Sequence, residues 1–526
     1  MMPRVPLLLA TFCCVLGAAD SRDLTGRVVD AQSGQPIARA QVRLQVFQGS
    51  QQGVQVAVLS DADGSFHVTN IPDGGYNVTC EKAGYLPASQ GVMPKAMPQT
   101  RAANTQPNTQ PAPLIIRLTA QAAIEGTVVD DKDTPAENIF IQLVLQQVMN
   151  GHRQFVPTMG DFTNETGSFR LFGLAAGRYY IGITGRVSGV RRAKLLAYPP
   201  LFYPNSMELA AAQPIDLKAG DEQQIKIRLP EPLPAREVRG VVAAAGPNVS
   251  VTLTREPASQ FPYPSNITSN WDPKTGTFRI GGVTPGIYLL TAGVSHGREY
   301  LQASTMVTVA DADVTGIRLD PAESGLDGTV HLEGNTGQQR PVFYVGLQSQ
   351  RAGNGAQVDA DGKFHVSNLA AGTYRVVPQV SGPWCVRSIQ QGGRDVRDGL
   401  FVTEGAPAPI DIVVTSHCGS VEASLAASDT TLPTDLMLAL LRKSGDELVL
   451  EKEGYLNGSV NNPTFLLQGI APGDYTLYAW PREAQIEYAN PEYMRQFESY
   501  GKAVTVTEDN KVNVTLDKVL PSPGQN

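Results

Sequence analysis

The sequence is poor in charge and lacks long apolar runs. Charged residues make up 17% of its 526 positions, the net charge is -8, and no run of Lys or Arg stands out. A nucleic-acid binder needs a basic face to neutralise phosphates, so this composition argues against that class. Beyond the N-terminus, no stretch approaches the roughly 20 apolar residues of a membrane helix, so no later membrane span is expected.

Cysteine is also scarce, and two of the five cysteines fall in the N-terminal stretch. Arg4 is followed by an apolar segment, Val5–Gly17, and by small residues ending at Ala19. This pattern predicts an export signal over residues 1–19, cleaved after Ala19; the alternative is a buried core segment. Phe12 precedes Cys13, which disfavours lipid attachment. We therefore expect a secreted, periplasmic or cell-surface protein.

Three cysteines remain after cleavage: Cys80, Cys385 and Cys418. An exported chain is in a compartment that permits disulfides. We expect a bridge between Cys385 and Cys418, with Cys80 free and buried; the alternative is that all three are unpaired core residues. Three scattered cysteines do not make a zinc site.

Glycine and proline, in contrast, are abundant. The chain has 51 Gly and 38 Pro, and 42% of its residues are hydrophobic. This balance favours short strands joined by many turns, with enough apolar residues to fill cores. The length predicts several domains.

An internal repeat is the strongest pattern in the sequence. Five segments carry a Phe and a Tyr ten residues apart, each followed two residues later by an aliphatic residue. The pairs are Phe66/Tyr76, Phe169/Tyr179, Phe278/Tyr288, Phe364/Tyr374 and Phe465/Tyr475. Residues two apart on a strand face the same side, so each ring and its partner are expected to point into a core.

A glycine lies between the two rings of every pair. It is Gly74, Gly177, Gly286, Gly372 or Gly473, and Pro285 and Pro472 stand directly before two of them. Pro-Gly favours a type II turn, in which glycine adopts a positive φ. The repeated motif therefore predicts a strand, a turn and a second strand.

Each repeat opens and closes with a β-branched or apolar strand. Gly26, Gly126, Gly240 and Gly328 begin the opening segments, and Ala423 takes this place in the fifth. The spacing predicts an all-β tandem array of about five immunoglobulin-like or transthyretin-like sandwiches of antiparallel sheets. The expected domains are residues 20–119, 120–232, 233–320, 321–416 and 417–518, with a disordered tail at 519–526.

The segments between these strands are irregular. The Pro-rich stretch 94–113 is expected to be a loop inside the first domain, before a closing strand at Leu114–Leu118, and residues 230–235 are expected to be a stiff junction. A short helix or turn is expected after Tyr198 and after Glu487.

The motifs resemble one known family. Gly26–Asp30, then Asp63–Phe66 and Ile71–Tyr76, are similar to the carboxypeptidase regulatory-like domain. The resemblance extends over most of the mature chain as five copies and implies a transthyretin-like or carbohydrate-binding-like fold. It does not carry a function with it, because unrelated functions share such folds.

Candidate chemistry is sparse. His296 and Glu299 form an H-x-x-E string similar to the zinc motif of metallocarboxypeptidases, with His417 as a conceivable third ligand. The string lies in a β repeat with no room for a peptidase domain, so we expect no catalytic zinc. The DADG segments at 61–64 and 359–362 lack the further ligands of a calcium loop, and an Asp-Gly turn is the expected interpretation.

The pattern as a whole predicts an exported, non-catalytic structural or interaction protein without cofactors. Its expected partner is a protein or glycan at the cell exterior. Carbohydrate binding is the alternative, with Trp271, Tyr198 and Tyr203 as stacking candidates, whereas Trp384 and Trp480 fit a core better. A role as accessory to a secreted hydrolase is a further alternative.

Overall fold

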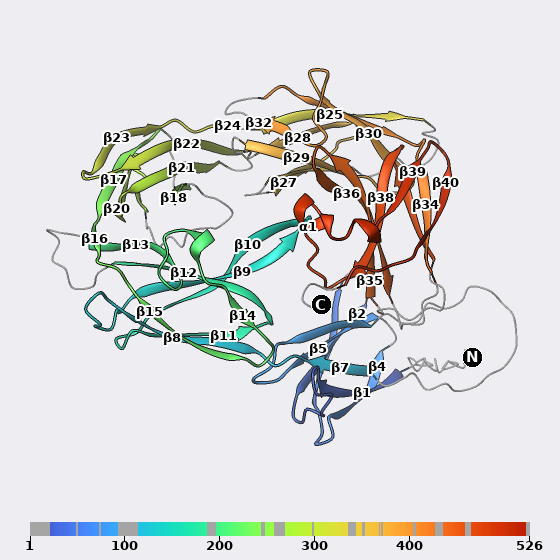
Figure 1. The fold of residues 1–526 in the computed structure, drawn as a ribbon, viewed down its shortest axis with the longest axis horizontal. Coiled ribbons are helices and arrows are strands. Elements are labelled where there is room, and N and C mark those ends of the chain that lie inside the picture. Colours follow the sequence, from blue (N-terminus) through green and yellow to red (C-terminus); the bar gives the residue numbers. More distant parts are fainter. Residues whose placement is uncertain are drawn as a thin grey trace, which may run out of the picture. The chain divides into compact units, whose positions relative to one another are not determined.

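The chain is built almost entirely of β-strands (Figure 1). In this computed structural model the described residues are 21–48, 51–72, 75–92, 114–186, 196–243, 248–256, 269–296, 299–323, 325–334, 343–349, 353–367, 369, 372–402, 407–426, 435–457 and 464–521. The predicted signal at 1–19, the loop at 94–113 and residues 522–526 of the expected tail lie outside them. The disorder expected from residue 519 is wrong at Leu520, which is fully buried and whose N–H donates to the carbonyl of Ala479 at 2.8 Å. Within these residues, no helix is long and apolar enough to cross a membrane.

The described residues divide into two compact units. The smaller unit takes the residues up to Gly126 together with Arg170–Gly177 and Asp216–Ile225, and the larger unit takes the rest. The boundary passes through the second repeat, so the sheets of that repeat are described separately below.

The first repeat forms a sandwich of two sheets. One sheet has the order β4-β1-β7 and the other β3-β2-β5-β6. The strands are β1 (Ser21–Asp30), β2 (Gln41–Gln48), β3 (Gln51–Leu59), β4 (Ser65–Pro72), β5 (Gly75–Glu81), β6 (Ala88–Val92) and β7 (Leu114–Leu118). Phe66 and Leu118 of the first sheet share one core with Val42 and Val78 of the second, and Tyr76 packs against it.

The second repeat contributes two sheets. They have the orders β11-β8-β15 and β10-β9-β12-β13-β16, with β14 paired to β12. Their elements are β8 (Ala122–Val129), β9 (Ile139–Met149), β10 (His152–Phe162), β11 (Ser168–Leu174), β12 (Gly177–Arg186), β13 (Leu196–Phe202), η1 (Leu209–Ala211), β14 (Ile215–Leu217), β15 (Glu222–Arg228) and β16 (Leu233–Pro234). Phe169 and Tyr179 are both buried.

The expected junction at 230–235 includes a short strand, because β16 pairs with β13.

The third repeat is again a sandwich. Its sheets have the orders β19-β20-β17-β23 and β18-β21-β22-β24, and Phe278 and Tyr288 lie in the core between them. The strands are β17 (Arg236–Val242), β18 (Val249–Arg255), β19 (Ser269–Asp272), β20 (Thr277–Val283), β21 (Gly286–His296), β22 (Glu299–Val309), β23 (Val314–Leu319) and β24 (Ala322–Glu323).

The fourth repeat encloses Phe364 and Tyr374 in its own core. Its sheets have the orders β28-β25-β33-β30-β31 and β27-β26-β29-β32. The strands are β25 (Gly325–Glu333), β26 (Tyr344–Gln348), β27 (Gly353–Gln357), β28 (Lys363–Ser367), β29 (Gly372–Gln379), β30 (Cys385–Gln391), β31 (Arg394–Asp395), β32 (Leu400–Val402) and β33 (Ile410–Thr415).

The fifth repeat encloses Phe465 and Tyr475 in a further core. Its sheets have the orders β37-β34-β40 and β36-β35-β38-β39. The elements are β34 (Gly419–Leu425), β35 (Asp435–Ser444), β36 (Glu447–Asn457), β37 (Thr464–Ile470), β38 (Gly473–Pro481), α1 (Pro491–Arg495), η2 (Glu498–Tyr500), β39 (Lys502–Val506) and β40 (Lys511–Leu516). We call the first, third, fourth and fifth sandwiches modules one, three, four and five.

The helix expected after Glu487 is present as α1. The Asn490 side chain accepts hydrogen bonds from the first turn, and Pro491 fits the first helical position because its missing N–H has no partner there anyway. The helix and the preceding loop cover a second apolar cluster on module five, in which Trp480 stacks on Tyr488 with ring centroids 6.1 Å apart.

The sheets are not wholly antiparallel, and that expectation is wrong. In each described module the closing strand runs parallel to the opening strand, as β7 does beside β1 and β40 beside β34. Parallel neighbours need a long crossover. Here the strands of the second sheet supply it, because the chain crosses to that sheet before returning.

The expectation of a positive φ is also wrong at the glycines of the two Pro-Gly pairs. Gly286 and Gly473 begin strands without a positive φ, whereas Gly282 (φ 81°) and Gly469 (φ 67°) adopt one. Each of the latter lies at a register shift of its strand, which defines a β-bulge. The bulge turns the next residue, Val283 or Ile470, into the core.

The core tyrosines of modules three and five are anchored through their hydroxyl groups. Tyr288 donates a hydrogen bond to the carbonyl of Thr284 at 2.8 Å, and Tyr475 donates to the carbonyl of Ala471 at 2.6 Å. In both, the acceptor lies four residues upstream, as in the tyrosine corner of other sandwiches. Burial raises the pKa of Tyr475, which keeps this donor protonated.

Candidate functional site

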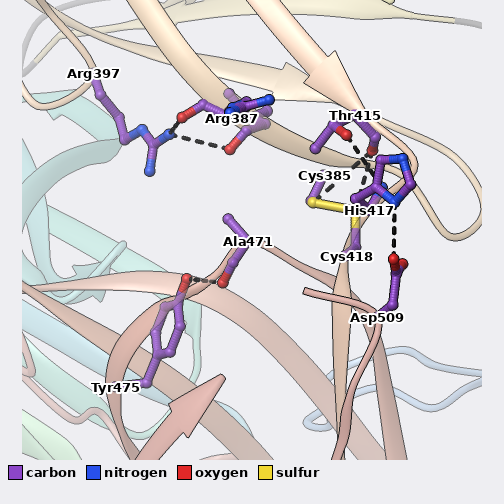
Figure 2. Close-up of a disulfide and its surroundings, with 10 residues drawn as sticks. Cys385, Arg387, Arg397, Thr415, His417, Cys418, Ala471, Tyr475 and Asp509 are labelled. Carbon is purple, nitrogen blue, oxygen red and sulfur yellow. Dashed lines mark hydrogen bonds and ion pairs between the residues drawn. A yellow bond between two sulfur atoms is a disulfide. The ribbon is translucent and has the colours of Figure 1, made fainter. Parts of the chain in front are cut away.

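The junction of modules four and five brings together a disulfide, which Figure 2 shows, a cleft and a close backbone approach. Cys385 begins β30 and lies opposite Thr415 at the end of β33, and Cys418 follows Thr415 by three residues. The two sulfurs are 2.12 Å apart and the Cα atoms 5.9 Å apart. The bridge therefore ties β30 of module four to the segment that enters module five.

The disulfide restricts the unfolded chain. Its cysteines are 33 residues apart, and loop-closure entropy for such a separation is worth roughly 3–4 kcal/mol. The third cysteine, Cys80, is free and fully buried in module one. Burial, with a smaller contribution from Glu81, raises the pKa of its thiol to about 11.

A cleft of about 560 Å³ opens beside the disulfide. Module four lines it with β29, the segment around Trp384 and the loop at Arg397 and Asp398; module five lines it with Arg442, β36 and Gly469. Arg442 donates two hydrogen bonds to Asp398, at 3.0 and 2.5 Å. Burial disfavours the charged form of Asp398, but hydrogen bonds from Arg442 and Ser444 outweigh it and lower the pKa of this carboxyl.

Gly469 allows the two modules to approach closely. A β-carbon on Gly469 would lie 2.6 Å from the carbonyl oxygen of Trp384 and 3.3 Å from that of Gly382. Glycine is therefore required at position 469 for two reasons: its positive φ in the bulge of β37, and the space that it leaves at the junction.

His417 pairs with a carboxylate in module five. Its Nδ1 lies 2.8 Å from Oδ2 of Asp509, in the turn between β39 and β40. The hydrogen bond and the charge of Asp509 raise the pKa of His417. Its backbone N–H also donates to the hydroxyl of Thr415 at 3.1 Å.

The sugar-stacking candidates lie in different surroundings. Tyr198 is only 7% exposed, so it has no ring face to offer a ligand, and burial raises its pKa. Tyr203 is half-buried beside a cis peptide bond to Pro204. Trp271 is half-buried on β19 and packs against the core of module three. Trp384 and Trp480 are buried, at 8% and 2% exposure.

The H-x-x-E string lies at a hairpin. His296 ends β21 and pairs with Glu299, the first residue of β22, while the two residues between them and the side chain of His296 lie outside the described part. Among the described residues, no group of three or more His, Cys, Asp or Glu side chains could hold a metal ion.

The DADG segments form tight turns between strands. Gly64 and Gly362 have φ near 80°, and their carbonyls accept hydrogen bonds from the N–H groups of Val28 and Val330. The Asp359 carboxylate accepts from the backbone N–H groups of Asp361 and Lys363, which is the hydrogen bonding of an Asx-type turn. These contacts occupy Asp359 within the turn.

Sequence reasoning missed the arginines of the cleft. Arg375, Arg397 and Arg442 come from three strands or loops that are distant in the sequence. Each lies in a segment whose pattern signals only a strand or a turn. No spacing rule could have grouped them, because their proximity depends on how the two modules pack.

Comparisons with known proteins cover only part of this chain. Residues 23–107 match the model of the carboxypeptidase regulatory-like domain. No curated protein matches the chain.

Several solved structures are similar to parts of the chain. The minor pilin GBS52 of Streptococcus agalactiae is 13% identical, with 40% of this chain and 96% of that one covered and a TM-score of 0.22. A streptococcal ancillary pilin is 14% identical, with 58% and 99% covered and a TM-score of 0.19. The shaft pilin SpaA of Lactobacillus rhamnosus GG is 11% identical, with 40% and 96% covered and a TM-score of 0.19. At these TM-scores the similarity carries no argument about function.

Proposed function

We propose that this chain, whose residues 23–107 match the carboxypeptidase regulatory-like domain, is an exported, non-catalytic protein with a structural or interaction role. Its β modules serve as spacers and docking surfaces at the cell exterior. The partner is a protein or glycan there.

One observation carries this proposal: the repeated motif of the sequence is used for packing. In modules three, four and five both ring residues are at most 7% exposed, and in module one Phe66 is buried while Tyr76 packs against the core. A repeat that encodes only the interior of a sandwich indicates selection for a stable scaffold. The disulfide at the junction of modules four and five supports the same role, because it stiffens a connection between modules.

Export and the absence of catalysis can be tested on the native protein. We expect mass spectrometry of the extracytoplasmic fraction to find a chain that begins at Asp20. We also expect peptidase and glycosidase substrate panels to show no turnover, with or without a chelator. An uncleaved chain in the cytoplasm would contradict export, and a chelator-sensitive activity lost in His296→Ala would contradict the non-catalytic role.

A glycan array on the same preparation separates the two kinds of partner. Binding that is abolished by Trp271→Ala would favour the carbohydrate-binding alternative. Tyr198→Phe is the matched control, because Tyr198 is buried and the change keeps its ring.

A further inference from the structure

The cleft between modules four and five has more cationic than anionic side chains. Its titratable lining residues are Arg375, Arg397, Arg442, Lys452, Asp398 and Glu451. Four cations and two carboxylates leave an excess of two positive charges. An excess of charge in a partly desolvated cleft favours binding of a counter-charge, because a cleft is less polarisable than bulk water.

Both carboxylates are already paired, and with the same arginine. Arg442 holds Asp398 through two hydrogen bonds, and its Nε lies 3.6 Å from Oε2 of Glu451. At 3.6 Å, Arg442 and Glu451 form an ion pair, but the two atoms are too far apart for a hydrogen bond. The backbone N–H of Arg397 donates to the Asp395 carboxylate at 2.9 Å, but among the described residues the guanidinium groups of Arg375 and Arg397 have no hydrogen-bonded carboxylate.

The free donors of these arginines are buried. The Nε atoms of Arg375 and Arg397 have no acceptor among the described residues, although both are shielded from solvent. Arg397 is held in place by hydrogen bonds from Nη2 to the carbonyls of Val386 and Arg387 (Figure 2). A buried donor without an acceptor costs about 1–3 kcal/mol, so a ligand oxygen that accepts from it is favoured by a similar amount.

Apart from Gln379 and Ser381, the uncharged side chains of the lining are mostly apolar. Val376, Val380, Trp384, Ile389 and Val449 line the same cleft. Its volume, about 560 Å³, is within the range typical of small-molecule sites. An inorganic ion would use the arginines and leave this apolar wall uncovered, whereas an organic anion would use both.

We propose that this cleft binds a small organic carboxylate, with Arg375 and Arg397 holding the carboxylate and the apolar wall covering its carbon skeleton. The planar guanidinium group suits this ligand because it presents paired donors to two oxygens. The site goes beyond the proposed scaffold function and does not depend on it.

Isothermal titration calorimetry on the full disulfide-bonded protein tests the site. The probes are citrate, glucuronate, glucose and sulfate at matched ionic strength. We expect saturable binding of citrate or glucuronate, no binding of glucose, and at least tenfold weaker binding of sulfate. Citrate binding with no glucuronate binding would indicate a compact polycarboxylate, and binding of glucuronate alone would indicate an acidic sugar; both support the site.

Substitutions assign the binding to the two arginines. Arg397→Gln and Arg375→Gln are each expected to weaken binding about tenfold or more, the effect of losing one charge-assisted pair. Arg318→Gln is the control, since Arg318 pairs with Asp320 on the exposed surface of module three. Arg397 also donates to two backbone carbonyls, so Arg397→Gln could unfold the protein. In that case Arg375→Gln alone tests the site, because the Arg375 side chain makes no such contact in the described part.

Three results would overturn the proposal. They are the absence of saturable binding by either carboxylate, sulfate binding as tight as that of the carboxylates, and carboxylate binding that is unchanged in Arg375→Gln.

Discussion

Single residues account for a regular feature of modules one, three and four, the glycine that faces the core Phe. Gly26, Gly240 and Gly328 pair across strands with Phe66, Phe278 and Phe364. A β-carbon at these glycines would lie 2.3, 2.6 and 2.2 Å from the facing ring. The ring therefore lies over the bare backbone of the opposite strand. In module five the pair is Ala423 and Phe465, so the packing there has adapted to a methyl group.

Gly240→Ala is therefore expected to destabilise module three by about 1–3 kcal/mol, because the new methyl group would lie 2.4 Å from the carbonyl oxygen of Ile317 and 2.6 Å from the Phe278 ring, so that backbone and ring must both move. Faster hydrogen exchange at the backbone amides of β17 and β20 would report this. Gly281→Ala is the matched control on β20, since its β-carbon would come no closer than 4.0 Å to Glu237. Equal effects of the two substitutions would contradict the close packing of the Phe278 ring and the Ile317 carbonyl around Gly240.

His417 gives a prediction about pH. Asp509 raises the pKa of His417 above its ordinary 6.5, so the imidazolium is favoured in the folded chain. The stabilisation it contributes is complete below pH 6.5 and is lost as the pH rises through the raised folded-state pKa. NMR titration of the His417 ring should show this elevated value.

Asp509→Asn should lower that pKa towards its ordinary value. Asparagine is a suitable replacement because Asp509 has φ of 54°, a conformation that asparagine tolerates. Glu508→Gln is the comparison and should lower the pKa less, because Glu508 acts on His417 only through its charge. An unchanged titration in Asp509→Asn would show that the pair does not form in solution.

Among the elements, the bulges shape the strands that carry the core. The positive φ of Gly282 and Gly469 comes one residue before an aliphatic core residue, where the strand register shifts. An extra residue at this point changes which side chain faces inward. The bulge on β37 additionally contacts module four, so one local irregularity serves both the core and the junction.

Gly469→Ala should lower the free energy of unfolding by more than the replacement of a glycine that has only a positive φ and no close neighbour. Gly445→Ala isolates that ordinary cost, because Gly445 has φ of 57° and no atom within 4 Å of its added β-carbon. We expect the free energy of unfolding to fall by about 1 kcal/mol in Gly445→Ala. In Gly469→Ala we expect it to fall by about 1–2 kcal/mol more. Urea unfolding followed by Trp384 and Trp480 fluorescence, with Trp271 replaced by Phe, measures both.

Across the larger unit, polar contacts connect one module to another. Arg442 of module five binds Asp398 of module four. Arg153 of β10 donates to Glu487, whose side chain is only 10% exposed and lies in the loop before α1. These contacts are more shielded than the surface pairs of the modules, so they are expected to contribute more to stability.

Asp398→Asn tests the first of these connections. At neutral pH it should lower the free energy of unfolding of modules four and five by about 1–3 kcal/mol, since Arg442 loses a charged acceptor at a partly buried position. Because the folded-state pKa of Asp398 is depressed below 3.8, the wild-type advantage is present above pH 3.8 and is lost as the pH falls through that depressed value.

The control for this substitution is Asp320→Asn, which breaks an exposed pair and should change stability by less than about 1 kcal/mol. A double-mutant cycle with Arg442→Gln gives the coupling energy directly. A coupling energy near zero would contradict the role of the pair in joining the modules.

Short-range patterns in the sequence were enough to predict the all-β class, the repeat and the ring residues that fill each described core. This was possible because strand alternation and turn chemistry act over a few residues, and their repetition makes the signal unmistakable. The Leu114–Leu118 strand and the helix at Pro491 follow from the same short-range rules.

Three features could be learned from the folded chain alone: the parallel pairing of opening and closing strands, the place of the positive-φ glycines and the arginine cleft. Each of these depends on segments that are far apart in the chain. Arg375, Arg397 and Arg442 meet because two modules pack against each other. Local patterns contain no information about that contact, since any exposed strand tolerates an arginine.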